Sequence, residues 1–218
     1  MHQQAFAKQG ISAAFERVIA LVVQPGVEFG HTDVHHFAPP AAEQLTASLS
    51  SMPGQVFEAH STDYQTSESL AALVRGGFSI LKVGPWLTFA LREALYGLDA
   101  IADVMDGKPP SNTLMVEMEK IMSERPEQWN KYYTGFQTEL WLQRHFSYSD
   151  RIRYYWPEPA ARAAADTVLE RLHGRTIPAT LLSQYLPTVN SNTAEEIVVE
   201  AVLNVLYQYD AACHPVGS

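Results

Sequence analysis

The chain has 218 residues, of which 46% are hydrophobic and 18% are charged. This composition is typical of a globular protein, and it excludes a disordered one. The formal net charge of −9 argues against a nucleic-acid partner, which would need a basic face. A small phosphorylated ligand is still compatible with that charge, because one lysine and a few backbone N–H groups suffice to bind a phosphate.

The cysteine content and the first residues bear on where the protein works. Cys213 is the only cysteine, so the fold does not depend on an oxidising compartment. His2 and Lys8 interrupt the first turns, which is not the pattern of a signal peptide. The apolar stretch Val18–Val23 is too short to span a membrane. We therefore expect a cytoplasmic protein with no membrane partner.

The first part of the chain predicts repeated strand–loop–helix units. Residues 2–17 are expected to be helical, with a break at Gly10, and the apolar run Ile19–Gln24 predicts a buried strand. A polar stretch, Val27–Phe37, leads to a helix over Ala41–Ser51. The elements expected next are a strand at Gln55–Ala59, a helix at Thr66–Arg75, a strand at Phe78–Val83 and a helix at Trp86–Asp103.

The second part of the chain, after Asp106, predicts helices and no strand. The helical segments expected are Asn112–Glu124, Glu127–Tyr133, Phe136–His145, Pro157–His173, Pro178–Tyr185 and Thr193–Ala212. The aromatic residues expected to anchor this part in a core are Trp129, Trp141, Tyr154, Tyr155 and Trp156.

The crossovers between the three strands are too long for hairpins, so the strands are expected to be parallel. A doubly wound sheet and a barrel fit this pattern equally well. Three strands cannot close a barrel, which needs eight strands and about 250 residues. Either strands have been missed, or the chain is a piece of a longer one.

Polar residues gather where the three strands end, which is where ligands bind in parallel α/β folds. After the first strand these are Gln24, Glu28, His31, Asp33, His35 and His36; after the second, Glu58, His60, Asp63 and Tyr64; at the third, Lys82, Gly84, Thr88 and Arg92. The histidines with Asp33 have the composition of a zinc or manganese site, although their spacing matches no compact ligand motif. The alternative is a set of solvated or hydrogen-bonded loop histidines.

Lys82 is the most informative single residue, because a lysine in an apolar strand is costly to bury. It could pair with Glu58 or Asp63, contact a phosphate beside Gly84, or form a Schiff base with a carbonyl substrate. A second polar and aromatic segment is Ser147–Trp156. Its Arg151 and Arg153 could reach a phosphate or an acidic partner, or could pack over an aromatic core.

Several strings of residues resemble one known family over essentially the whole chain. They are Val22–Phe29, Phe57–Gln65, Leu81–Pro85, Leu87–Leu95, Tyr148–Pro157 and Ser183–Pro187. They are similar to the accessory subunit of class II tagatose-1,6-bisphosphate aldolase, a family also labelled tagatose-6-phosphate kinase.

The resemblance implies a fold and a domain division. Family members are roughly twice this length and form a (β/α)₈ TIM barrel, so this α/β chain would be the C-terminal half. Residues 1–106 would supply the last three βα units, and residues 107–218 a helical extension packed on the barrel. A strand edge at Ile19–Gln24 would then be open, and we expect poor solubility or self-association.

The resemblance also implies a site. The family is similar to zinc-dependent class II aldolases, which implies His31 and His60 as metal ligands and Lys82, Gly84 and Thr88 as a phosphate site. Other polar residues at these strand ends are Glu28, Asp33, Glu58 and Asp63. Zinc is thus the one cofactor that the resemblance suggests.

The implied function is that of a non-catalytic subunit, which supports the activity and stability of a separate aldolase in galactitol or N-acetylgalactosamine catabolism. The partners would be that catalytic subunit and a sugar phosphate. One alternative is a metal-dependent phosphosugar lyase or isomerase that uses His31, His60 and Lys82. The kinase label finds no support, because the sequence has neither a P-loop nor a kinase signature.

Overall fold

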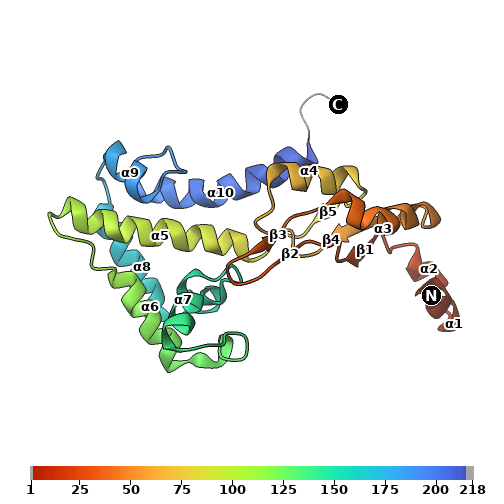
Figure 1. The fold of residues 1–218 in the computed structure, drawn as a ribbon, viewed down its shortest axis with the longest axis horizontal. Coiled ribbons are helices and arrows are strands. Elements are labelled where there is room, and N and C mark those ends of the chain that lie inside the picture. Colours follow the sequence, from red (N-terminus) through yellow and green to blue (C-terminus); the bar gives the residue numbers. More distant parts are fainter. Residues whose placement is uncertain (1, 215–218) are drawn as a thin grey trace. The chain divides into compact units, whose positions relative to one another are not determined.

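The structure, a computed structural model, describes residues 2–214 and has a mixed α/β fold with more helix than strand (Figure 1). The chain divides into two compact units. The sheet unit contains the residues up to Glu28, Val34–Val83 and the segment from Gln208 onward. The helical unit contains Phe29–Asp33 and Gly84–Tyr207.

The sheet unit is built on three parallel strands in the order β1-β4-β5. These are β1 (Ala20–Val23), β4 (Val56–Ala59) and β5 (Ile80–Leu81). The predicted strands and their parallel direction are confirmed. However, β5 is shorter than expected, because the Phe78 N–H donates to the Leu73 carbonyl and closes the preceding helix instead of joining the sheet.

The connections of the sheet unit carry its helices. The first strand leads through β2 (Glu28–Phe29) and β3 (Val34–His35), a small hairpin, to η1 (Pro39–Ala42), α3 (Glu43–Ser48) and η2 (Leu49–Ser51). The polar stretch Val27–Phe37 is therefore partly strand, not only loop. The second connection is α4 (Ser67–Arg75), which begins where the Thr66 hydroxyl accepts from the Ser69 N–H. Two short helices, α1 (His2–Lys8) and α2 (Ser12–Phe15), precede the sheet.

Aromatic rings form the core of the sheet unit. The Phe78 ring lies 5.5 Å from that of Phe57 and 5.8 Å from that of Phe37. Leu70 and Leu73 from α4 are also fully buried. Phe57 of β4 thus packs on this aromatic core, and α4 contacts the neighbouring strand β5.

The helical unit packs around one long helix, α5 (Pro85–Met105). The others are α6 (Thr113–Glu124), α7 (Gln137–Phe146), α8 (Pro159–Leu172), α9 (Ala179–Tyr185) and α10 (Ala194–Cys213), with short 3-10 turns η3 (Pro126–Gln128) and η4 (Arg151–Tyr154). The last residues of α10, from Gln208, belong to the sheet unit. In the described residues after Asp106 there is no strand, as expected.

One predicted helix is wrong. Residues 127–133 form only the end of η3 and irregular turns. Trp129 and Tyr133 are held there by long-range contacts: the Trp129 indole donates to the Met122 carbonyl at 2.7 Å, and the Tyr133 hydroxyl lies 3.0 Å from the Ser149 hydroxyl. Tyr155 is a core residue as expected, whereas Tyr154 is 44% exposed and is not.

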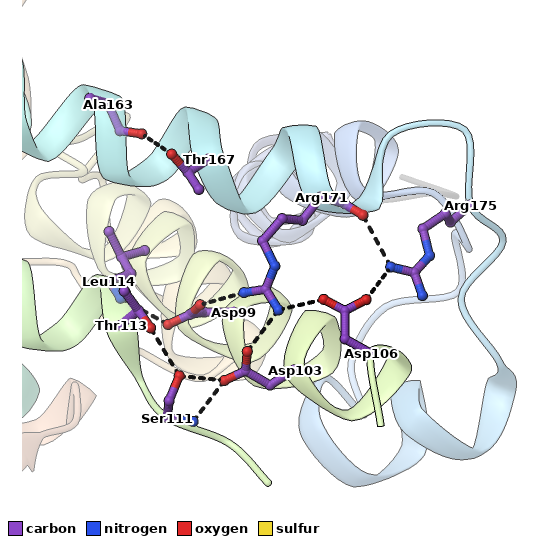
Figure 2. A network of polar contacts seen from close by, with 10 residues as sticks. All are labelled: Asp99, Asp103, Asp106, Ser111, Thr113, Leu114, Ala163, Thr167, Arg171 and Arg175. Atoms are coloured by element: carbon purple, nitrogen blue, oxygen red, sulfur yellow. Dashed lines mark hydrogen bonds and ion pairs between the residues drawn. The ribbon is translucent and has the colours of Figure 1, made fainter. Parts of the chain in front are cut away.

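Carboxylates on α5 connect three helices of this unit, as Figure 2 shows. Asp103 accepts from the Ser111 N–H at 2.7 Å and from its hydroxyl at 2.6 Å. Arg171 of α8 donates to Asp103 at 2.7 Å and to Asp106 at 2.9 Å, while Asp99 accepts from the Leu114 N–H at the start of α6. We call the group formed by Asp99, Asp103, Asp106, Ser111 and Arg171 the α5 clamp.

Among the described residues, no helix is both long and apolar enough to cross a membrane.

Candidate functional site

The carboxyl ends of β4 and β5 bring two basic side chains together. Lys82 Nζ lies 2.9 Å from His60 Nε2. An ammonium group can only donate, so this bond requires an unprotonated Nε2 and places the imidazole proton on Nδ1, 3.3 Å from the Ser61 hydroxyl. The pair can therefore move a proton or bind an anionic oxygen, which makes it a candidate acid–base site.

The loop that carries His60 is held in a defined shape. Ser61 and Tyr64 both have positive φ, at 57° and 60°, which is a costly conformation for residues with a side chain. The buried Thr62 hydroxyl lies 2.9 Å from the Lys82 carbonyl, and the Tyr209 hydroxyl donates to the Thr62 carbonyl. These bonds join the ends of the two strands and hold the backbone of Thr62 beside that of Lys82.

The other polar residues predicted in the sheet unit have separate places. Glu28 accepts from the Gln24 amide at 2.9 Å, and Asp63 is buried. Glu58 lies within β4, opposite Val22 on one side and Ile80 on the other. The side chain that lies against Lys82 is His60, and not Glu58 or Asp63 as predicted. His35 and His36 are exposed.

The remaining predicted residues lie in the helical unit; they are His31, Asp33, Gly84, Thr88 and Arg92. Asp33 lies in the β2–β3 turn, where its carbonyl accepts from the Gly30 N–H at 2.9 Å. His31 Nδ1 lies 3.0 Å from the Ser147 hydroxyl, and its ring meets Tyr133 edge-on. Gly84 precedes the start of α5. Thr88 donates to Asp150 at 2.6 Å, so this hydroxyl is already used within the protein.

Asp150 contacts the predicted residues Thr88 and Arg92, and the sequence pattern did not single it out. It accepts from Thr88 and from Arg92 Nε, and both Asp150 and Arg92 are fully buried. Burial raises the pKa of the Asp150 carboxyl, while the nearby Arg92 opposes that shift. Asp150 lies in Tyr148–Pro157, one of the segments that resemble the known family, and this could have drawn attention to it. The polar pattern of that segment instead pointed to Arg151 and Arg153.

The predicted zinc site can be compared with the positions of its predicted ligands, His31 and His60. Within residues 2–214, no group of three His, Cys, Asp or Glu side chains is arranged to hold a metal ion. His60 already faces Lys82 and Ser61, and His31 faces Ser147. The described residues therefore do not fit a zinc ion by themselves.

The sequence of the chain matches one known family. Residues 1–214 match the family described as D-tagatose-1,6-bisphosphate aldolase subunit GatZ/KbaZ-like. A D-tagatose 6-phosphate 4-epimerase from Agrobacterium fabrum is 55% identical over 97% of this chain and 51% of its own length. A D-tagatose-1,6-bisphosphate aldolase subunit GatZ from Klebsiella pneumoniae is 43% identical, again over 97% of this chain and 52% of its own length.

A solved structure is similar as well. It is described as a probable tagatose 6 phosphate kinase from Sinorhizobium meliloti, and it matches with a TM-score of 0.93 and 51% identity. The match covers 97% of this chain and 57% of that one. The chain thus spans about half the length of the relatives it matches.

Proposed function

Because the chain belongs to the D-tagatose-1,6-bisphosphate aldolase subunit GatZ/KbaZ-like family, we propose that it works in carbohydrate catabolism on a phosphorylated ketose of the tagatose series. The observation that carries this proposal is the match over residues 1–214. It is supported by the names of these relatives, each of which refers to a phosphate of tagatose. The basic His60–Lys82 pair at the strand ends suits an anionic ligand.

We also propose the architecture of the whole protein. The three parallel strands would be the last three of a (β/α)₈ barrel, because α3 and α4 occupy the crossovers as such a barrel requires. The other strands would come from the half of the relatives that this chain does not match. Residues 1–106 would then be the barrel portion and residues 107–218 the helical extension.

The first candidate role is that of an accessory subunit, which binds a catalytic class II tagatose-1,6-bisphosphate aldolase subunit and supports its activity and stability. The family description and the aldolase subunits at 40% and 43% identity favour this role.

The second candidate role is 4-epimerisation of tagatose 6-phosphate. It is favoured by the relative at 55% identity, which is named as such an epimerase. His60 and Lys82, whose side-chain nitrogens lie 2.9 Å apart, would be its acid–base groups. Either role is compatible with the same fold, since one fold can support several chemistries.

One experiment separates the two roles. The purified chain is mixed with a catalytic aldolase subunit, and the cleavage rate and thermal half-life of that subunit are measured; in parallel, the chain alone is incubated with tagatose 6-phosphate, and inversion at C4 is followed by NMR. The accessory role predicts a faster and longer-lived aldolase and no inversion. The epimerase role predicts inversion that is lost in Lys82→Met, whereas Lys108→Met retains it. If neither effect occurs, both roles are wrong.

The zinc ion that the resemblance implies is a separate proposal. The described residues contain no group of three possible metal ligands, so we derive no reaction step through a metal. Metal analysis of the purified chain tests it: zinc that is retained by the wild type and lost in both His31→Ala and His60→Ala would support a metal site.

A further inference from the structure

The last turns of α10 contact the loop that follows β4. Tyr209 belongs to the sheet unit and is only 8% exposed there. Its hydroxyl donates to the Thr62 carbonyl at 2.9 Å. Burial raises the pKa of Tyr209, so this hydroxyl keeps its proton and remains a donor. A helix far along the chain thus supplies a buried hydrogen bond to the loop that carries His60.

Thr62 connects Tyr209 to Lys82. The Thr62 side chain is fully buried, and its hydroxyl donates to the Lys82 carbonyl at 2.9 Å. Thr62 follows His60 closely in the sequence, and the Lys82 ammonium group lies 2.9 Å from His60 Nε2. Hydrogen bonds therefore join Tyr209, Thr62 and the backbone of Lys82 into one chain, and both members of the His60–Lys82 pair adjoin it.

The loop between His60 and α4 depends on contacts of this kind. Ser61 has a φ of 57° and Tyr64 a φ of 60°, and residues with a side chain adopt such a backbone only at a cost. A strained loop relaxes unless the surrounding structure holds it. The hydrogen bonds of Thr62 lie between these two strained residues, where they oppose that relaxation.

We propose that Tyr209 and Thr62 are positioning residues, which hold His60 against Lys82. Side chains of a site keep their geometry when a second layer of hydrogen bonds fixes them. The other role open to Tyr209 is to anchor α10 on the sheet unit, which the buried ring would do without its hydroxyl. This inference rests on the proposed use of the His60–Lys82 pair as an acid–base or anion-binding site, and it states how that pair is held.

The position of the His60 proton reports on the pair directly. An ammonium group can only donate, so contact with Lys82 keeps the proton of the neutral imidazole on Nδ1. A loop shift that separates the two side chains lets Nε2 carry that proton instead. NMR of the isotope-labelled chain shows which ring nitrogen is protonated, and His60→Gln identifies the signals by their loss.

The test compares variants that differ by one hydroxyl or by position. Tyr209→Phe removes the hydroxyl and keeps the ring, whereas Tyr207→Phe makes the same change on α10 at a side chain that is 60% exposed. Thr62→Val removes the other hydroxyl of the chain, and Thr62→Ser retains it. Amide hydrogen exchange of the loop after His60 is measured in each variant together with the NMR signals of His60.

We expect Tyr209→Phe and Thr62→Val to move part of the His60 proton to Nε2. They should also speed amide exchange in the loop by about tenfold, because each leaves a buried carbonyl without its donor. Tyr207→Phe and Thr62→Ser should keep the wild-type proton position and stay within about twofold of wild-type exchange. Thermal unfolding shows whether each variant retains the fold, and the two Thr62 variants decide the matter if Tyr209→Phe does not fold.

Three results would overturn the inference. Signals and loop exchange that Tyr209→Phe and Thr62→Val both leave unchanged would show that other contacts hold the pair. Exchange that quickens equally throughout the sheet unit, with the His60 proton unmoved, would show that Tyr209 only anchors α10. A wild-type His60 with its proton on Nε2 would contradict the pair itself.

The proposed function fails or stands separately, because these measurements need no substrate. A chain that neither inverts tagatose 6-phosphate nor supports an aldolase subunit, yet responds to the four variants as expected, would lose the proposed function and keep this inference.

Discussion

His145 is a buried histidine whose two nitrogens both have partners. Nδ1 lies 2.8 Å from the Tyr96 hydroxyl and Nε2 lies 3.1 Å from the Glu119 carboxylate. Since Tyr96 has a raised pKa and keeps its proton, it donates to Nδ1, and the neutral imidazole donates from Nε2 to Glu119. Burial lowers the pKa of His145 to about 4, although Glu119 opposes the shift.

This lowered pKa makes stability depend on pH in a defined window. In the unfolded chain the histidine becomes protonated as pH falls below its ordinary pKa of about 6.5. In the folded protein it stays neutral until the pH approaches about 4. The stability that His145 contributes is therefore complete above pH 6.5 and is lost as pH falls from there toward 4. We expect His145→Gln to be less stable at pH 7 by about 1–3 kcal/mol and to show a flatter stability profile across that window. Urea unfolding at several pH values measures both.

A contradictory result would be a pH profile that is as steep in His145→Gln as in the wild type. His173 provides the matched control, because its side chain is 81% exposed and pairs with the exposed Glu195. His173→Gln should leave the profile between pH 4 and 6.5 almost unchanged.

At this scale the sequence predicted residue types better than partners. Lys82 was expected within an apolar strand, but β5 ends at Leu81 and Lys82 is exposed, and His60 was not expected to be its partner. Asp150 was missed although it joins Thr88 and Arg92. In each case the partner is set by side-chain direction and by contacts between segments distant in sequence, and local pattern contains neither.

Among the elements, α5 and α8 depend most clearly on charged contacts. Arg171 of α8 reaches Asp103 of α5 and Asp106 just after it, as Figure 2 shows, and its guanidinium is also 3.8 Å from the buried Asp99. The hydrogen bonds from Ser111 are the main cause that lowers the pKa of Asp103 to about 2, with Arg171 adding to them. Burial raises the pKa of Asp99.

Removing the arginine should loosen this helix pair. Arg171→Met keeps the aliphatic stem but leaves Asp99 and Asp103 without their cation, while Asp106 keeps its ion pair with Arg175. We expect a loss of about 2 kcal/mol at pH 7, since two of these acids are almost fully buried. Arg162→Met, on the same helix but with no ion pair among the described residues, should lose less than about 0.5 kcal/mol. Equal losses in the two variants, measured by urea unfolding, would contradict the role of the α5 clamp.

The sequence predicted elements well where the pattern is long and local. The helices of the second part of the chain repeat apolar residues over several turns, and most were found near their observed bounds. The hairpin β2–β3 was missed, because each strand has only two residues. The helix expected at residues 127–133 failed because Trp129 and Tyr133 are held by Met122 and Ser149, which local propensity cannot anticipate.

For the whole molecule, the edge of the sheet has consequences for association. In the described residues β1 pairs only with β4, so its outer backbone groups have no strand beside them. Ile19 is 66% exposed and Val22 is 61% exposed, both high for a parallel sheet, whose faces are usually covered. An open apolar edge of this kind favours pairing with another chain.

We therefore expect the purified chain to self-associate through β1, and Val22→Lys to reduce that association, because a charged side chain on an edge strand opposes further pairing. Sedimentation velocity over a range of protein concentrations measures the change. Val199→Lys introduces the same charge at a valine on α10 that is 56% exposed, and it should leave association unchanged. A wild-type chain that sediments as a monomer at all concentrations would show that the exposed edge does not drive association, and equal effects of the two lysines would assign it to net charge instead.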